Sequence, residues 1–421
     1  MNSLEYDLNE KETNLNPNEK YFKCLKIILI ILIVIIILLI AGFIVILVFY
    51  LKNVNNDDMM IYYNLTYPLD DTIKNSFKLG EINYNQKLEN VNNGNNYYRT
   101  ERNIFDLFIP NSTMLRKDKY NKVILYIHGG GYFYGDKKSH HKDCKEKGKL
   151  GFICATMNYN YLRREATSEY TIMRNLDEIT AVIETIKRFL KMLGYNEKKL
   201  ELVIGGGSAG GHYSSLYAYW LGDKSPIPIK FVVTTVAPIT FEFEHFWTYN
   251  KSIGPLDSIE PEDIKIAKDT HKIINNTNNP LIFWNTSWCV VQMNIFLGRG
   301  FDAHLFEMFI SDDNWDINRT NPYFIELYET SKLFYPVYHI DHNTIPTLCY
   351  YGGKDVDIGI DHYPYLRTKY KENDNNGNLT LVYSKYANHS IFEEKSKEGM
   401  EATNYFNSKF TDFMNKYLSK D

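Results

Sequence analysis

The chain has 421 residues, enough for a hydrophobic anchor and one large α/β domain without a second enzymatic domain. Its formal net charge is −4, with 47 Lys and Arg against 51 Asp and Glu, so it has no basic field for binding nucleic acid. The five cysteines form no C-x-x-C pair and have no zinc-like spacing, which argues against a metal site and a disulfide-dense scaffold. Whether the four later cysteines pair is left open.

An uncharged apolar run covers residues 27–51 and is long enough, at about 1.5 Å per residue, to span a bilayer core of roughly 30 Å. A cleaved signal peptide would have a shorter apolar run, so the pattern predicts a transmembrane signal-anchor helix. Lysines 20, 23 and 26 precede the run, whereas one lysine and then two aspartates follow it. The positive-inside rule therefore predicts a cytosolic N-terminus and a lumenal or extracellular remainder.

These boundaries predict a cytosolic tail over 1–26, the anchor over 27–51 and a polar stalk over 52–96. The catalytic domain is expected over 97–421.

The alternating run at 103–109 predicts an antiparallel entry strand. Short apolar runs, typical of strands buried on both faces of a parallel sheet, follow at 123–127, 152–157, 200–204, 231–236, 346–351 and 379–383. An amphipathic helix is predicted between Met173 and Leu190, ending at Gly194, and another at about 401–418. This alternation predicts an α/β fold with a mostly parallel, doubly wound sheet.

An aromatic-rich stretch at 238–345 interrupts the alternation of strands and helices. It is too long for a loop, so we interpret it as a helical cap that contributes an apolar pocket. The alternative is that these aromatic residues only stabilise the packing.

The segment 205–211 reads Gly-Gly-Gly-Ser-Ala-Gly-Gly, directly after a predicted strand and before a helix-compatible stretch. It contains G-x-S-x-G in the strand–turn–helix context of a nucleophile elbow, which presents Ser208 on a sharp turn flanked by Gly206 and Gly210. The alternative is a phosphate-binding turn. No Lys-Ser or Lys-Thr follows, which excludes a Walker A loop. The motif comes after two predicted parallel strands instead of opening the first βαβ unit, which disfavours a dinucleotide site.

A second glycine-rich segment, His128-Gly129-Gly130-Gly131, follows the predicted strand at 123–127. Consecutive glycines leave backbone N–H groups unobstructed, as the stabilisation of an oxyanion requires. With the serine elbow later in the chain, Gly130 and Gly131 can supply two donors and Ala209 a third.

Together these segments resemble the HGGG group of α/β hydrolases, which includes hormone-sensitive-lipase-like enzymes, arylacetamide and steryl deacetylases and kynurenine formamidases. The resemblance covers about residues 103–418 and implies an α/β-hydrolase fold, a serine nucleophile, a later acid and a histidine near the end of the chain. The segment Gly352-Gly353-Lys354-Asp355 matches the loop that carries the acid in this family, with Asp357 as the rival, and His389 takes the place of the base.

The chemistry expected of Ser208, Asp355 and His389 needs neither a metal nor a cofactor. Other histidines compete less well: His339 and His342 precede the acid, His362 follows it closely, and His212 is expected to pack in the core. The cluster at 140–144 is interpreted as a solvated loop in preference to a metal site.

Two departures from the family pattern stand out: Gly207 replaces the usual acid before the nucleophile, and residues 159–164 replace a familiar Tyr-Arg-Leu-Ala-Pro-Glu stretch. The sequence predicts a membrane-anchored serine hydrolase that acts on small-molecule or lipid esters of apolar alcohols. An amide or formamide hydrolase, an acyltransferase and a non-catalytic binding ectodomain are the alternatives. The resemblance to membrane-anchored deacetylases favours the endoplasmic reticulum over the cell surface, and the oligomeric state is left open.

Overall fold

The computed structural model describes residues 25–26, 28–32, 76–83, 102–114, 116–163, 171–242, 292–293, 295–299, 320–355, 357–359, 362–393 and 395–419. The chain divides into two units, Met1–Met60 and Ile61–Asp421.

In the first unit, residues 25–26 and 28–32 are helical, and their large apolar side chains are exposed. Most of the anchor predicted at 27–51 lies outside the described residues. Among those that the structure describes, no helix is both long and apolar enough to cross a membrane.

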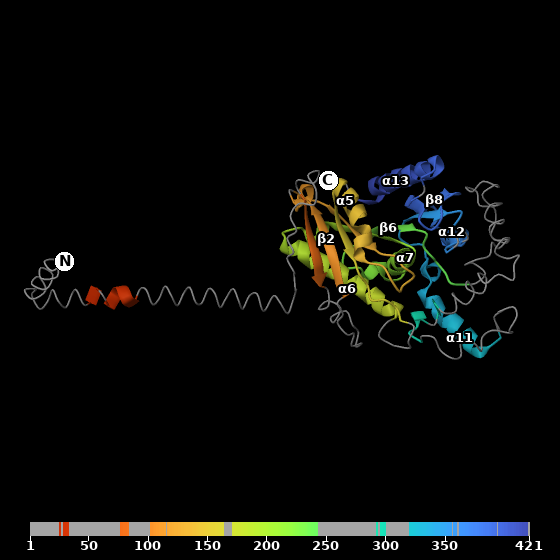
Figure 1. The fold of residues 1–421 in the computed structure, drawn as a ribbon, viewed down its shortest axis with the longest axis horizontal. Coiled ribbons are helices and arrows are strands. Elements are labelled where there is room, and N and C mark those ends of the chain that lie inside the picture. The colour runs from red at the N-terminus through yellow and green to blue at the C-terminus, as the bar shows by residue number, and fades with distance from the viewer. Residues whose placement is uncertain are drawn as a thin grey trace, which may run out of the picture. The chain divides into compact units, whose positions relative to one another are not determined.

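One eight-stranded sheet with the order β1-β2-β4-β3-β5-β6-β7-β8 organises the second unit (Figure 1). Its strands are β1 Ser76–Asn83, β2 Ile104–Pro110, β3 Asn121–Ile127, β4 Phe152–Met157, β5 Leu200–Gly207, β6 Ile229–Thr235, β7 Thr347–Gly352 and β8 Leu379–Ser384. The pairs β1–β2 and β2–β4 are antiparallel, and every other pair is parallel. This mostly parallel sheet with flanking helices fits the α/β-hydrolase fold.

Helices connect the strands: α4 Asn111–Met114, α5 His141–Lys149, α6 Ile172–Met192, α7 Ala209–Leu221, α11 Pro322–Ser331, α12 His362–Glu372 and α13 Lys397–Tyr417. Helix α6 begins where the Thr171 side chain accepts a hydrogen bond from the Arg174 amide, a helix-capping contact. Helix α13 begins in the same way, with Ser396 accepting from Gly399 N.

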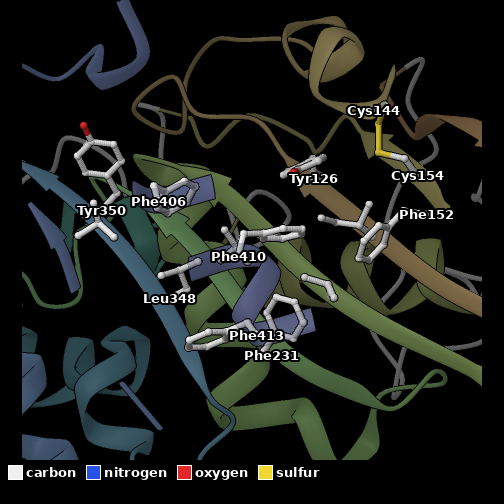
Figure 2. Packing of buried hydrophobic residues seen from close by; sticks show 14 of the residues in the cluster. Tyr126, Cys144, Phe152, Cys154, Phe231, Leu348, Tyr350, Phe406, Phe410 and Phe413 are labelled. Atoms are coloured by element: carbon white, nitrogen blue, oxygen red, sulfur yellow. A yellow bond between two sulfur atoms is a disulfide. The ribbon is translucent and has the colours of Figure 1, made fainter. Parts of the chain in front are cut away.

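Alternate residues of the strands point to opposite faces of the sheet. On one face, aromatic residues of α13 and the disulfide between Cys144 of α5 and Cys154 of β4 pack over the strands (Figure 2). The Lys147 ammonium of α5 lies 3.8 Å from the centre of the Phe410 ring of α13, so these two helices are neighbours. Helices α6 and α7 pack against each other, and α7 contacts β3, β5 and β6.

The predicted strands after residue 100 and both long helices are confirmed, with boundaries that differ by a few residues. Strand β1 lies within the segment 52–96 that was expected to be a polar stalk. Its alternation of Phe77 and Leu79 breaks before Ile82, where the pairing register with β2 shifts, so a strict period of two does not reveal it. The predicted cap at 238–345 lies largely outside the described residues.

Candidate active site

The strand register places the ends of five parallel strands at one edge of the sheet. Ile127 is paired with Gly206, Gly207 with Thr235, Thr235 with Tyr350, and Gly352 with Ser384. The loops that carry His128, Ser208, Asp355 and His389 therefore all leave the sheet at this edge. Ligands of open α/β sheets bind at the carboxyl ends of the strands.

Ser208 lies between β5 and α7 with φ of 53° and ψ of −126°. A positive φ is uncommon for a residue with a side chain, and such strain is concentrated at functional sites. The Ser208 amide donates to Thr235 O at 2.9 Å, and the Ser208 carbonyl accepts from His212 N at 3.0 Å. The turn is thus tied to β6 on one side and to the first turn of α7 on the other.

Close backbone contacts explain the glycines of the elbow. A Cβ atom on Gly206 would lie 2.4 Å from Ile127 O, and one on Gly210 would lie 2.0 Å from the same oxygen. A Cβ on Gly207 would lie 2.8 Å from Thr235 Oγ1. At Gly207, where the family pattern has an acid, a side chain would therefore require the Thr235 hydroxyl to move.

The glycine loop 128–131 packs directly on this elbow. A Cβ on Gly129 would lie 2.9 Å from Gly207 O and 3.3 Å from Ser208 Cβ. Gly130 and Gly131 have φ of 114° and 54°. Their amides donate to no group among the described residues, and Ala209 N belongs to the first turn of α7, where amides lack a partner within the helix. The loop can therefore direct free N–H groups toward the space beside Ser208.

His128 holds the glycine loop in place. Its Nδ1 lies 2.7 Å from Gly129 O, and its Nε2 lies 3.3 Å from an Arg102 guanidinium nitrogen. Because the carbonyl can only accept and the guanidinium can only donate, His128 is neutral, with its proton on Nδ1. Burial, opposed by the Gly129 hydrogen bond and aided by the charge of Arg102, lowers its pKa to about 4.

Two further residues anchor the loop and were not singled out in the sequence. The Tyr159 ring stacks on His128 with centroids 4.2 Å apart, and Arg102 donates from Nε to Tyr159 O at 2.9 Å. Arg102 directly precedes the predicted strand at 103–109, and Tyr159 follows the one at 152–157. Their position at the ends of neighbouring strands was the only available signal.

The predicted acid and base meet. His389 Nδ1 lies 2.9 Å from Asp355 Oδ2, and Asp355 Oδ1 accepts from the amides of Asp357 and Ile358, both at 2.9 Å. Asp355 is buried, whereas the rival acid, Asp357, is exposed. The described contacts include no hydrogen bond between Ser208 Oγ and His389. The geometry thus joins two of the three predicted residues and places Ser208 at the same sheet edge; its role as the nucleophile stays a prediction.

The charge around His389 favours its protonated form. Burial lowers the pKa of the imidazole, but the Asp355 hydrogen bond and the negative charges of Asp355 and Asp357 outweigh it and raise the pKa above 6.5. A raised pKa suits a base that must hold a proton during the reaction.

The competing histidines form hydrogen bonds with backbone groups away from Asp355. His212 Nε2 lies 2.8 Å from Phe334 O and His339 Nε2 lies 2.7 Å from Leu333 O, while His362 Nδ1 accepts from Ile239 N at 3.3 Å. The cluster at 140–144 forms the start of α5 instead of a solvated loop. There, His141 Nε2 lies 2.7 Å from the buried carboxylate of Asp106 in β2, and this contact connects the segment to the sheet.

Asp355, Asp357 and His389 place potential metal ligands within 4.8 Å of one another. His389 Nδ1 is already directed at Asp355 Oδ2, and both oxygens of Asp355 have partners within the chain. The hydrogen bonds of an acid–base pair thus engage two of the three residues in this group. The expectation of a metal-free site stays a prediction.

The family model BD-FAE matches residues 105–246, which include the glycine loop and the serine elbow. Together with the sheet order, this match supports an α/β hydrolase of the esterase type. No curated protein matches the chain.

Solved esterase structures are similar to the chain at low identity. A truncated carbohydrate esterase from gut microbiota is 14% identical, with 82% of this chain and 99% of that one covered at a TM-score of 0.48. A butyrate-bound thermophilic esterase from Thermogutta terrifontis is 14% identical; 76% of this chain and 92% of that one are covered, at a TM-score of 0.46. An inhibited form of esterase B from Lactobacillus rhamnosis is 15% identical; 89% of this chain and 97% of that one are covered, at a TM-score of 0.46.

Proposed function

We propose that the chain is a serine hydrolase that cleaves carboxylic esters of apolar alcohols or lipids through an acyl-enzyme. The proposal depends above all on one observation: Ser208 occupies a positive-φ turn against the glycine loop, and the His389–Asp355 pair leaves the sheet at the same edge. A nucleophile, oxyanion donors and an oriented base are the parts that acyl transfer requires.

In the proposed reaction, Ser208 Oγ attacks the ester carbonyl while His389 takes its proton, and Asp355 stabilises the imidazolium. The amides of Gly130, Gly131 and Ala209 bind the oxyanion. Collapse of the tetrahedral intermediate breaks the bond to the alcohol, which leaves with the proton from His389. Water, activated in turn by His389, then hydrolyses the acyl-enzyme and restores Ser208.

We also propose that residues 27–51 anchor this domain to a membrane, with the N-terminus cytosolic and the domain lumenal or extracellular. The exposed apolar side chains of Leu25 and of residues 28–32 support the anchor, because such surface is stable in lipid. The Cys144–Cys154 disulfide supports a lumenal or extracellular location of the domain, because disulfides persist in oxidising compartments. Alkaline extraction of membranes should leave the chain in the pellet; release into the supernatant would argue against the anchor.

The test of the hydrolase is the hydrolysis of p-nitrophenyl acetate, butyrate and palmitate by the detergent-solubilised full chain. Wild type should turn over one or more of these esters, and the acyl length that it prefers measures the acyl pocket. Ser208→Ala should abolish this turnover. Ser390→Ala is the matched control and should keep it, because this exposed serine follows the base directly but has no role in the proposed reaction. A panel of the corresponding anilides and formamides distinguishes an amide hydrolase. No turnover of any ester or amide would favour a binding ectodomain.

A further inference from the structure

Three buried polar side chains have atoms without a hydrogen-bond partner among the residues that the structure describes. They are the Tyr132 hydroxyl, His212 Nδ1 and both polar atoms of the Gln292 amide. Tyr132 is 2% exposed, and His212 and Gln292 are 0% exposed. Buried polar groups are nearly always paired, so each exception needs an explanation such as a missing ligand or water.

Two of these residues, Tyr132 and His212, belong to one aromatic cluster. The Tyr132 and His212 rings are perpendicular, with centroids 5.6 Å apart, and the Phe296 ring lies 5.0 Å from Tyr132 and 5.6 Å from His212. Phe241 closes the cluster, 5.5 Å from His212 and 4.9 Å from Phe296.

The cluster adjoins the machinery of the proposed reaction on two sides. Tyr132 directly follows the oxyanion glycine Gly131 and itself has φ of 74°. His212 lies one helical turn after Ser208, whose carbonyl accepts its amide hydrogen. A group bound in the cluster would therefore belong to a molecule held beside Ser208.

The hydrogen-bonding state of the two rings defines what they can bind. His212 Nε2 faces the Phe334 carbonyl, so the proton is on Nε2 and Nδ1 is a bare acceptor. Burial lowers the pKa of His212 to about 4, which keeps the ring neutral. Burial raises the pKa of Tyr132 well above its usual range, so its hydroxyl keeps a proton to donate. A single group that served both atoms would donate to His212 and accept from Tyr132, and a hydroxyl group does both.

We propose that Tyr132 and His212 form a subsite that binds a free hydroxyl group of the ester substrate, with the surrounding aromatic rings covering its carbon chain. This inference rests on the proposed esterase function and narrows the substrate to hydroxylated esters. A buried water could make the same hydrogen bonds, and the experiment distinguishes the two sources.

The experiment compares esters that differ by a hydroxyl, using the detergent-solubilised full chain in a pH-stat. On the acyl side the pair is methyl 3-hydroxybutyrate and methyl butyrate; on the alcohol side it is glyceryl monobutyrate and propyl butyrate. The measured quantity is the ratio of kcat/KM for the hydroxylated ester to that for its partner. Wild type should prefer the hydroxylated member of at least one pair.

Tyr132→Phe removes the donor and keeps the ring, so it should lower that ratio by about tenfold, the effect of one lost hydrogen bond. Tyr213→Phe is the matched control: its ring lies 5.4 Å from that of Tyr132, but its hydroxyl already donates to Asn175 Oδ1 at 2.8 Å. The control should leave the ratio at its wild-type value.

Wild-type ratios near one for both pairs would overturn the subsite, even if Tyr132→Phe fails to fold. An unchanged ratio in folded Tyr132→Phe would also overturn it and leave a buried water as the occupant. If no ester of either kind is hydrolysed, the proposed function itself fails, which is a different outcome.

Discussion

Asp355 Oδ2 lies 2.9 Å from His389 Nδ1, although the two residues are 34 positions apart and follow different strands. Strands β7 and β8 are neighbours in register, with Gly352 paired to Ser384, and the Lys354 amide donates to Ala387 O at 2.9 Å. The two loops are therefore hydrogen-bonded to each other through their backbones, independently of the Asp355 and His389 side chains.

This relationship distinguishes the two candidate acids. Asp355→Asn should lower kcat for ester hydrolysis by about 10⁴, because an amide cannot hold the imidazole in the required tautomer. Asp357→Asn should retain most of the activity at high pH, since Asp357 donates only its amide to Asp355. Equal losses in the two variants would contradict the assignment of Asp355. The measurement is steady-state hydrolysis of a p-nitrophenyl ester at pH 8.5.

The pKa of His389 predicts a pH profile. The base must be neutral, so kcat/KM should fall as the pH drops through a pKa that lies above 6.5. Asp357→Asn removes one of the charges that raise this pKa, and the acid limb should move to lower pH. Glu393→Gln, which removes a nearby exposed charge outside this set, is the control and should leave the limb in place. A limb that moves upward in Asp357→Asn would contradict the electrostatic argument.

Gly129→Ala tests the packing of the glycine loop on the elbow. The added methyl group would lie 2.9 Å from Gly207 O. The glycine loop or the serine elbow must therefore move, which displaces the oxyanion donors from their positions beside Ser208. We expect a fall in kcat of about 10² or more, the size of the loss when one oxyanion donor is removed. Gly148→Ala is the control: in helix α5, its Cβ would meet only Pro110 Cγ at an ordinary 3.7 Å. It should keep wild-type activity and gain a few tenths to about 1 kcal/mol of stability. Full activity in Gly129→Ala would contradict the close packing.

Reduction of the Cys144–Cys154 disulfide should destabilise the domain. The bridge closes a loop of sequence separation 10, and its removal should cost about 2–3 kcal/mol, visible as a melting temperature several degrees lower in dithiothreitol. A Cys144→Ala, Cys154→Ala double variant should melt at the same temperature with and without reductant. The remaining described thiol, Cys349, is buried, and burial raises its pKa. A wild-type melting temperature unaffected by reductant would argue against the bridge.

Most of the sheet could be predicted because buried parallel strands are short continuous apolar runs, such as 123–127 and 200–204. The order of glycine loop, serine, acid and histidine along the chain also predicted which side chains meet at one sheet edge. Contacts of long sequence separation could not be predicted in this way. The Arg102–His128 contact, the Cys144–Cys154 pair and the polar atoms around Tyr132 depend on which loops become neighbours, which no local pattern encodes.

The buried charges show the same limit. Arg174 donates from Nε to Glu178 at 2.9 Å, and neither side chain is exposed. The backbone N–H of Asn160 donates to the same carboxylate. At four residues apart on a helix, Arg174 and Glu178 look like an ordinary surface pair. The loop after β4, which carries Asn160, makes them part of a buried network.

Labelling of the full chain with a fluorophosphonate probe, followed by peptide mapping of the modified residue, identifies the nucleophile directly. We expect one modified serine, Ser208, with labelling lost in Ser208→Ala and slowed in Asp355→Asn. Labelling of a different serine, or no labelling of folded wild type under conditions that label a known serine esterase, would contradict this assignment.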